Sequence, residues 1–412
     1  MYEVAVTGFG IVCPIGIDPA EFSKRLFAGE SGLSAIRGAM VAQNFPVSSA
    51  APVPLTRLRQ PAVLRDLDPQ RTPKFWRFAG IATEDAIETL PEDLPIDAVV
   101  YGNMEGFPFA LIKDSFCNFA AGQFDWDSSL PEASLNLIRS ILEQRGHPAI
   151  DDRNLIGINN ACVSANQAIG VAAHRIRSGV WARAVVGAVF AYCNDSELMN
   201  FVMLGATTTA EGPPAEASRP FSRDRSGFVL GEGAATLVLE TREAAEARGA
   251  KILGYVSGYG STSDSYRITD GRPDGKAAAE AMLRAVKDAN LSVEQISAIS
   301  AHGTSTRLND KVETLAIKRA LGAAAYRVPV ISLKSQVGNS TFAAGALEAV
   351  ACLLMLSEQT LAPTINYKEF DPECDLDYVP NAARPAVVDR VLSNSFGFGG
   401  QNACVVFARS PT

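Results

Sequence analysis

Short apolar runs rich in valine and isoleucine alternate along the chain with longer alanine-rich segments. The short runs predict buried strands, and the longer segments, apolar at every third or fourth position, predict helices. The predicted strands cover residues 3–10, 97–103, 154–160, 183–190, 234–241, 252–260, 296–303, 328–335 and 402–409. The predicted helices cover residues 20–29, 75–90, 134–146, 165–179, 275–290, 310–322 and 344–359. This alternation predicts an α/β fold with largely parallel, buried strands.

One pattern occurs in both halves of the chain. An apolar strand at 154–160 leads through a cysteine-containing loop into the alanine-rich helix at 165–179. The strand at 328–335 likewise leads through a loop of glycine, asparagine and serine into the helix at 344–359. The repetition predicts two similar α/β halves, residues 1–245 and 246–412, each with a strand–loop–helix junction.

The composition predicts a large folded core. Of the 412 residues, 47% are hydrophobic and 20% are charged, which is typical of a globular protein. The net charge of −8 argues against nucleic acid as the main partner, because phosphate binding needs a basic surface. The longest apolar stretch that we identify, at 184–193, is too short to cross a bilayer, and no secretory signal is evident. We therefore expect a cytoplasmic protein that does not enter a membrane.

Cysteine and histidine usage narrows the chemistry. Seven cysteines without a CxxC motif or a Cys/His cluster predict reduced thiols and no metal site. Any mechanism that needs imidazoles must use His147, His174 or His302. One Pro-punctuated segment is basic, and it is either a docking patch for an acidic partner or an ordinary solvated surface; its cations are Arg57, Arg59, Arg65, Arg71, Lys74 and Arg77.

Cys162 stands where the strand at 154–160 meets the helix at 165–179. The ordinary role of a single cysteine is buried packing. A helix N-terminus, however, offers free N–H groups and a positive dipole end, which lower a thiol pKa and favour the nucleophilic thiolate. The flanking residues are small and leave room for a substrate. Cys162 is therefore a candidate nucleophile.

Two later loops carry further candidates. His302 ends an apolar strand, and the edge formed by strand ends is where α/β proteins bind ligands. The hydroxyls of Thr304 and Thr306 either cap the next helix or bind an amide-rich substrate arm. Lys334 follows an apolar run, which favours a buried and paired role over a solvated one. The Gly-Phe-Gly-Gly segment at 397–400 can approach a ligand closely and supply half of an oxyanion hole.

Five motifs occur in order along the chain: VAVTGFGIVCPIG at 4–16, ACVSANQAIG at 161–170, RPFSRDRSGFVLGEGAATLVLE at 219–240, AHGTSTRLND at 301–310 and SNSFGFGGQNA at 393–403. Together they resemble the β-ketoacyl synthases of the thiolase-like superfamily, the condensing enzymes of fatty-acid and type II polyketide synthesis. The resemblance implies a five-layered αβαβα fold with two pseudo-repeated halves. It also implies a homodimer, or a heterodimer with a related chain.

The resemblance assigns roles to the candidate residues. In this family a cysteine takes up an acyl group from a thioester, and two histidines promote decarboxylation of a malonyl thioester, whose enolate attacks the acyl-enzyme. Cys162 matches the cysteine and His302 the first histidine. Lys334 matches the motif lysine, and Glu313 matches the carboxylate of the following helix. The backbone N–H groups of Cys162 and of the gating residue Phe398, beside Gly399, would form the oxyanion hole.

Substrate contacts are implied in the same way. Thr304 and Thr306 would hold a pantetheine arm, and Phe201, Thr269 and Phe107 would also contact the substrate. The donor would be an acyl carrier protein or a CoA thioester, and no cofactor is expected. Bulky and charged residues in the segment 99–112, where the family usually has a small glycine-rich loop, favour a short or unusual acyl group.

The chain departs from the family at Asn339. The family motif reads Lys-Ser-x-x-Gly-His, whereas residues 334–339 read Lys-Ser-Gln-Val-Gly-Asn. An asparagine amide supplies two N–H donors, although it cannot act as a base. The type III ketoacyl synthases use a Cys-His-Asn set for the same overall reaction, so Asn339 is compatible with condensation.

Three functions fit these residues. The first is decarboxylative condensation in type II polyketide or fatty-acid-like biosynthesis. The second is a non-condensing partner subunit resembling the chain-length factors, which typically lack the cysteine. The third is acyl transfer to an amine or a hydroxyl, which needs the same cysteine and oxyanion hole. Retention of Cys162, His302 and Lys334 favours the condensing enzyme.

Overall fold

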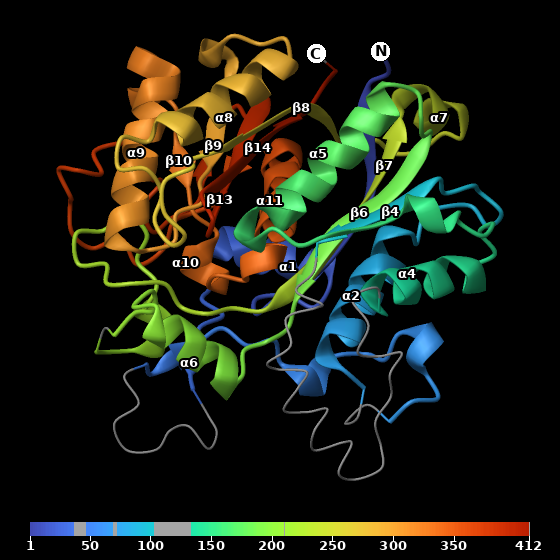
Figure 1. The fold of residues 1–412 in the computed structure, drawn as a ribbon, viewed down its shortest axis with the longest axis horizontal. Helices are drawn as coiled ribbons and strands as arrows, with labels where there is room; N and C mark the ends of the chain where they lie inside the picture. The colour runs from blue at the N-terminus through green and yellow to red at the C-terminus, as the bar shows by residue number, and fades with distance from the viewer. Residues whose placement is uncertain (37–46, 69–71, 103–132, 210, 412) are drawn as a thin grey trace.

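A computed structural model describes residues 1–36, 47–68, 72–102, 133–209 and 211–411. Within these ranges the largest sheet has ten strands, and its strand order divides it into two halves (Figure 1). One half has the order β5-β4-β6-β7-β1, with strands Leu155–Ile158, Ala98–Gly102, Arg183–Phe190, Gly233–Thr241 and Val4–Val12. The other has the order β10-β9-β13-β14-β8, with strands Val330–Ile331, Ala298–Ser300, Arg390–Gly397, Gln401–Ala408 and Gly254–Ser263.

The two halves repeat one topology. In each, the first strand along the chain lies innermost, the second and third follow at the outer end, and the fourth and fifth fill the space between. The halves meet where β1 pairs with β8, through Ala5 with Tyr255 and Val6 with Gly254. The predicted repeat of strand, loop and helix is therefore present. The predicted boundary between residues 245 and 246 falls within the short helix α7 (Arg242–Ala247) and stays a prediction.

The expectation of largely parallel strands was wrong. β4 runs parallel to β5 and β6, and β9 runs parallel to β10 and β13. The ladders of β1 with β7, β6 with β7, β13 with β14, and β8 with β14 are antiparallel. Each half is thus a mixed sheet, because one strand, β7 in the first half and β14 in the second, runs against the other four.

Helices complete five layers. α5 (Ser164–Arg177) and α11 (Ala344–Glu358) contact each other and pack between the two half-sheets. α2 (Lys74–Ala86) and α4 (Ala133–Gln144) cover the outer face of the first half. α8 (Lys276–Asp288) and α9 (Arg307–Leu321) lie together on the outer side of the second. Figure 1 shows the resulting αβαβα order, as the resemblance implied.

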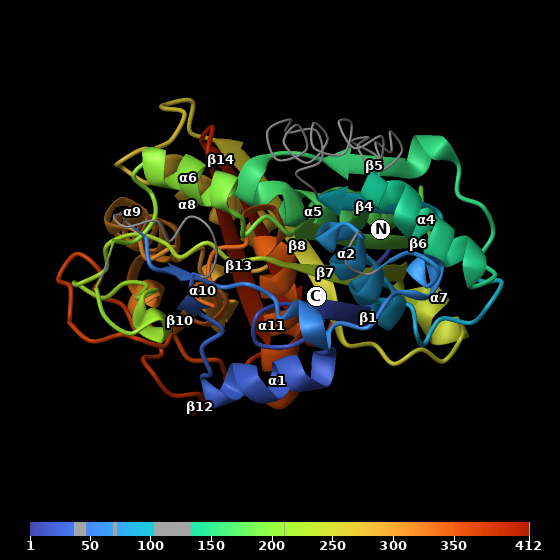
Figure 2. The ribbon, with the colours of Figure 1, turned by 90° about the horizontal axis from the view of Figure 1, so that it is seen from below.

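Buried apolar side chains fill the spaces between these layers, and the largest cluster surrounds α5 and α11. The segment Thr341–Glu358 has a mean hydropathy of 1.5 and is long and apolar enough to span a membrane, but 89% of it is buried within the protein. Among the described residues it is the one helix that meets these criteria, and it was not singled out from the sequence. A helix that is apolar on every side is expected when other elements surround it. α1 (Pro19–Ala28) packs against this helix, as Figure 2 shows from below.

Several elements were not predicted. β13 was absent from the predicted strands, and the Gly-Phe-Gly-Gly segment forms its turn into β14, with Gly399 and Gly400 at φ +85° and +75°. Three helices were also missed, α6 (Asp195–Met203), α7 and α10 (Lys334–Val337). Two small two-stranded sheets pair β2 (Ser34–Ala35) with β3 (Ser49–Ala50) and β11 (Thr360–Leu361) with β12 (Arg384–Pro385).

The basic segment at 55–77 does not form an open cationic patch. Arg57 pairs with Glu21, and Arg59 pairs with Glu84 and Asp85. The remaining described cations behave similarly, apart from Arg65: Lys74 pairs with the buried Glu232, and Arg77 is buried and donates to backbone carbonyls. Arg71 lies outside the described residues. Because carboxylates neutralise three of the five described cations and a fourth is buried, the segment is a poor docking surface for an acidic partner.

Candidate active site

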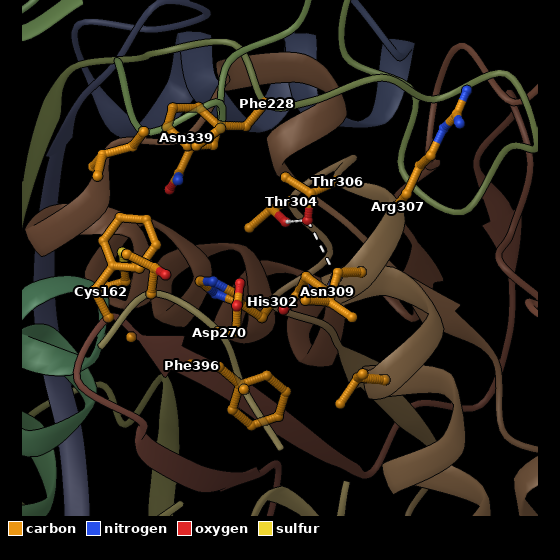
Figure 3. A pocket seen from close by; sticks show the side chains of 18 of the residues that line it. Cys162, Phe228, Asp270, His302, Thr304, Thr306, Arg307, Asn309, Asn339 and Phe396 are labelled. Atoms are coloured by element: carbon orange, nitrogen blue, oxygen red, sulfur yellow. Dashed lines mark hydrogen bonds between the residues drawn. The ribbon is translucent and has the colours of Figure 1, made fainter. Parts of the chain in front are cut away.

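A cavity of about 410 Å³ leads from the surface to Cys162. Cys162, His302 and Asn339 lie around one end of it (Figure 3). Eight of the predicted site residues line its wall: Cys162, Phe201, Thr269, His302, Thr304, Thr306, Asn339 and Phe398. Lys334, Glu313 and Gly399 are not part of the lining, and Phe107 lies outside the described residues, as do Met104 and Glu105.

Cys162 sits in a tight turn ahead of α5. The short 3-10 helix Ala161–Val163 precedes α5, and Ala161 has a φ of +48°, which is strained for a residue with a side chain. The end of β13 packs against this turn, since a Cβ added at Gly397 would lie 3.4 Å from the Cys162 backbone nitrogen. The turn therefore brings the Cys162 backbone N–H close to the Gly-Phe-Gly-Gly segment.

The expectation of a lowered thiol pKa was wrong. Burial raises the pKa of the Cys162 thiol to about 11, and Glu348 adds to the rise. The charge of Lys334 and the backbone N–H of Cys162 act in the opposite direction without overcoming burial. Because the side chain is only 7% exposed, removal from water outweighs the helix terminus. The resting group is a thiol.

His302 is fixed by its backbone. The N–H groups of His302 and Gly303 each donate to a carboxylate oxygen of Glu313 at 2.8 Å. Gly303 has a φ of +40°, and a Cβ there would lie 2.7 Å from the Ser332 Cβ. Burial raises the pKa of Glu313 to about 7, although these hydrogen bonds and one from Asn394 lower it. Glu313 thus holds the turn that presents His302 and does not itself reach the cavity.

The His302 imidazole meets a buried ion pair. Nδ1 lies 3.4 Å from Nζ of Lys334, which pairs with Glu348 on α11. An ammonium can only donate, so Nδ1 accepts and Nε2 carries the ring proton. Burial, with the charge of Lys334, holds the pKa of His302 well below its usual range. His302 is therefore a neutral hydrogen-bond donor.

Asn339 is anchored on three sides. It follows Gly338, whose φ is +70°; its backbone N–H donates to the Val229 carbonyl at 2.7 Å, and its carbonyl accepts from the Gly231 N–H at 3.0 Å. Its side-chain Oδ1 accepts from the Thr341 N–H at 3.2 Å. Since Oδ1 is engaged, Nδ2 is the free end of the amide, and Figure 3 shows the amide directed into the cavity.

The turn after Asn339 repeats the turn at the cysteine. The 3-10 helix Thr341–Ala343 precedes α11 as Ala161–Val163 precedes α5, and Thr341 has a φ of +40°. Phe342 therefore occupies the place that Cys162 holds in the other half. Its ring is buried and stacks on Phe190 with centroids 6.2 Å apart.

The outer wall carries hydroxyl and aromatic groups. Thr304 and Thr306 share a hydrogen bond of 3.0 Å, and Thr306 also caps α9 by accepting from the Asn309 N–H. These hydroxyls can therefore serve both roles considered for them: Thr306 caps the helix, and both side chains line the cavity where a substrate arm would bind. Phe201 packs edge-to-face on Phe228 with centroids 5.2 Å apart.

Sequence reasoning missed two residues beside His302. Glu348 is the single acidic residue among the first fourteen residues of an otherwise apolar helix, which is the signal that could have revealed it. Its Oε2 has no hydrogen-bond partner among the described residues, and burial raises the pKa of its carboxyl to about 7. The ring of Phe396 on β13 has its centroid 5.7 Å from that of the His302 ring, and the sequence assigned this residue no role.

Comparison with known proteins agrees with this geometry. The N-terminal and C-terminal domains of β-ketoacyl synthase match residues 155–245 and 253–368. 3-Oxoacyl-[acyl-carrier-protein] synthase 2 of Synechocystis sp. is 45% identical over 99% of this chain and 98% of its own. A ketosynthase solved with its type II polyketide acyl-carrier protein and a hexaketide superposes with a TM-score of 0.88 at 30% identity, covering 99% of this chain and 100% of that one. The ishigamide ketosynthase/chain length factor superposes with a TM-score of 0.84 at 32% identity, covering 99% of both chains.

The fold is that of the thiolase-like condensing enzymes, with the cavity at the junction of its two halves. The chain belongs to the β-ketoacyl synthases. It is an acyltransferase that catalyses condensation in fatty-acid or type II polyketide biosynthesis, the first of the three functions considered for the sequence.

Proposed function

We propose that Cys162, His302 and Asn339 perform the condensation as a nucleophile and two hydrogen-bond donors. The observation that carries the proposal is that these side chains, contributed by both halves, line one cavity, and that separate hydrogen bonds hold His302 and Asn339. Lys334 and Glu313 act as positioning residues, because they fix the His302 ring and backbone without lining the cavity. Glu348 joins them through its ion pair with Lys334.

The first step loads the enzyme. The sulfur of Cys162 attacks the acyl carbonyl of a thioester, a new C–S bond forms, and the C–S bond to the donor breaks. The thiol proton passes to the departing thiolate, so an acyl-enzyme and a free donor thiol result. The backbone N–H groups of Cys162 and Phe398 would bind the oxyanion, since the β13 turn packs against the Cys162 turn.

The second step forms the carbon–carbon bond. A malonyl thioester loses CO₂, and the resulting enolate attacks the acyl carbon on Cys162. The Cys162 thiolate leaves and takes one proton from solvent, and the product is a β-ketoacyl thioester. His302 Nε2 and Asn339 Nδ2 would donate to the enolate oxygen as negative charge develops on it. Both steps balance without a cofactor, and we propose none.

The partners follow from the donor chemistry. We propose an acyl carrier protein or CoA thioester as donor, with Thr304 and Thr306 holding the pantetheine arm and Phe201 and Thr269 beside it.

We also propose a homodimer, or a heterodimer with a related chain, through β5. This strand ends the sheet and its apolar residues Leu155, Ile156 and Ile158 are only half-buried, so a second strand beside it would cover an open edge. We retain the cytoplasm as the expected compartment.

Intact-mass measurement tests the assignment. Incubation with an acyl thioester should add one acyl group to the wild type and none to Cys162→Ala. His302→Ala should still load, because it leaves the nucleophile and the oxyanion N–H groups in place, and should fail to form product when malonyl thioester is added. An increment that persists on Cys162→Ala, or equal loss of both steps in His302→Ala, would contradict these roles.

A further inference from the structure

A second hollow adjoins the mouth of the catalytic cavity, and Arg307 and Leu308 line both. Its remaining lining residues are all charged: Arg223, Arg225, Lys311, Asp371 and Glu373. This is a different region from the basic segment at 55–77. It lies where a thioester-bearing arm would leave the cavity.

Most of the charges in this hollow are already paired. Arg225 is buried and binds Asp371 at 2.5 Å and Asp310 at 3.5 Å. Lys311 binds Glu373 at 2.5 Å. Asp371, whose pKa the Arg223 charge also lowers, is thus engaged by Arg225. Among the described residues, Arg223 and Arg307 form no ion pair, and both are exposed. We call these two residues the outer arginine pair.

Arg307 is partly fixed in place. It is the first residue of α9, and its Nε donates to the Arg225 carbonyl at 3.4 Å. That contact leaves the two terminal nitrogens of the guanidinium free. Figure 3 shows the side chain extending outward beyond Thr306. A guanidinium held in this way presents the fork that binds phosphate oxygens in bidentate fashion.

The wall from His302 to Arg307 leads outward. His302 and Thr304 are 4% and 6% exposed, Thr306 is half-buried, and Arg307 is exposed. From the inner end outward, the side chains along this wall are a neutral hydrogen-bond donor, two hydroxyls and a cation. A phosphopantetheine thioester has the same order from its reacting end: a thioester carbonyl, two amides and a phosphate ester.

We infer that the outer arginine pair, Arg223 and Arg307, binds the phosphate ester at the outer end of the pantetheine arm. The inference rests on the proposed function of Cys162. The arm would enter with its thioester at Cys162, its amides beside Thr304 and Thr306, and its phosphate in the hollow. Two unpaired guanidinium groups at the mouth of an acidic protein draw the anion to the cavity and hold it there.

The test compares donors that differ only in the phosphate. Acyl-phosphopantetheine and acyl-pantetheine are each used to load Cys162, and the ratio of their kcat/KM values measures the phosphate preference. In the double variant Arg223→Gln/Arg307→Gln this ratio should fall at least about tenfold, since each lost charge-assisted contact is worth about that factor. The control is Arg284→Gln, an exposed arginine on α8 that pairs with Glu280, which should keep the wild-type ratio.

The outcomes separate the proposals. An unchanged ratio in the double variant, or equal use of both donors by the wild type, overturns the phosphate site. If the double variant also loses kcat/KM for loading from an acyl carrier protein, the carrier is the source of the phosphate. If it loses kcat/KM with acyl-CoA alone, CoA is the source. Either result supports the site. Failure of the proposed function would look different, because no donor would then add mass to Cys162 in the wild type.

Discussion

Nζ of Lys334 lies 3.4 Å from Nδ1 of His302, and both side chains are buried. This contact determines which imidazole nitrogen carries the proton, because the ammonium has no acceptor to offer. In the proposed reaction Lys334 would therefore orient a donor toward the cavity, while Glu348 balances its charge.

Lys334→Met should reduce condensation by up to about 10²-fold, because the His302 proton is no longer confined to Nε2. It should also cost about 3–5 kcal/mol of stability where Glu348 is ionised, since that carboxylate then lacks its partner. The pKa of Glu348, about 7 with Lys334 present, should rise further, so the loss of melting temperature should grow as pH rises. The double variant Lys334→Met/Glu348→Gln should recover most of the melting temperature but not the condensation rate. Recovery of both would reduce Lys334 to a structural role.

Asn339→Ala should slow decarboxylation and condensation by about 10²–10³-fold with little effect on loading, because it removes a donor to the enolate. Asn339→Asp is the matched control. It retains the side-chain oxygen that accepts from Thr341, loses the N–H, and adds a negative charge that would repel the enolate. Both variants should therefore be slow in single-turnover product formation. A normal rate in Asn339→Asp would show that this side chain serves the turn and not the reaction.

Alkylation of Cys162 by iodoacetamide should accelerate about tenfold per pH unit from pH 7 to pH 10, because the thiolate reacts and the thiol pKa is about 11. Mass analysis of the wild type against Cys162→Ala assigns the modified residue. A plateau near neutral pH would mean that the Cys162 turn stabilises the thiolate, as its position before a helix first indicated.

Glu313→Gln should destabilise the protein by about 1–3 kcal/mol, because an amide can accept from only one of the two N–H groups of His302 and Gly303. The pKa of Glu313 is raised from 4.5 to about 7, so the native state binds more protons than the unfolded state between these values. The stability contributed by its protonation is therefore present below pH 4.5 and is lost as pH rises to 7. Glu313→Gln should remove this part of the pH dependence of the melting temperature. If the pH dependence of the melting temperature is unchanged in Glu313→Gln, the group that titrates between pH 4.5 and 7 is not Glu313.

The strand ends that carry the chemistry could be predicted from sequence, because apolar runs stop abruptly at Cys162, His302 and Lys334. The layers followed from the spacing of strands and helices and from the family motifs. β13 could not be predicted from the sequence, because its residues Ser393, Asn394 and Ser395 are polar and yet buried. Alternation of apolar and polar residues identifies a strand with one solvated face, and this strand has none.

Electrostatic partners were harder to foresee than positions. Glu348 and Lys334 lie on different helices, so no helix or strand periodicity pairs them. Only the packing of α11 against the sheet brings their charges together. The Cys162 pKa was misjudged for a related reason: a helix terminus is visible in sequence, whereas the degree of burial is not. The basic segment at 55–77 was likewise neutralised by Glu21, Glu84 and Asp85 of other segments.

Cys162 and Phe342 occupy corresponding turns in the two halves, but only the first turn carries a nucleophile. The two halves therefore differ in chemistry although their backbones follow the same topology. Covalent storage of the acyl group belongs to the first half. The proposed donors to the enolate, His302 and Asn339, and the Lys334–Glu348 pair beside them belong to the second. A lesion confined to the second half would therefore leave a protein that still captures acyl groups and cannot extend them.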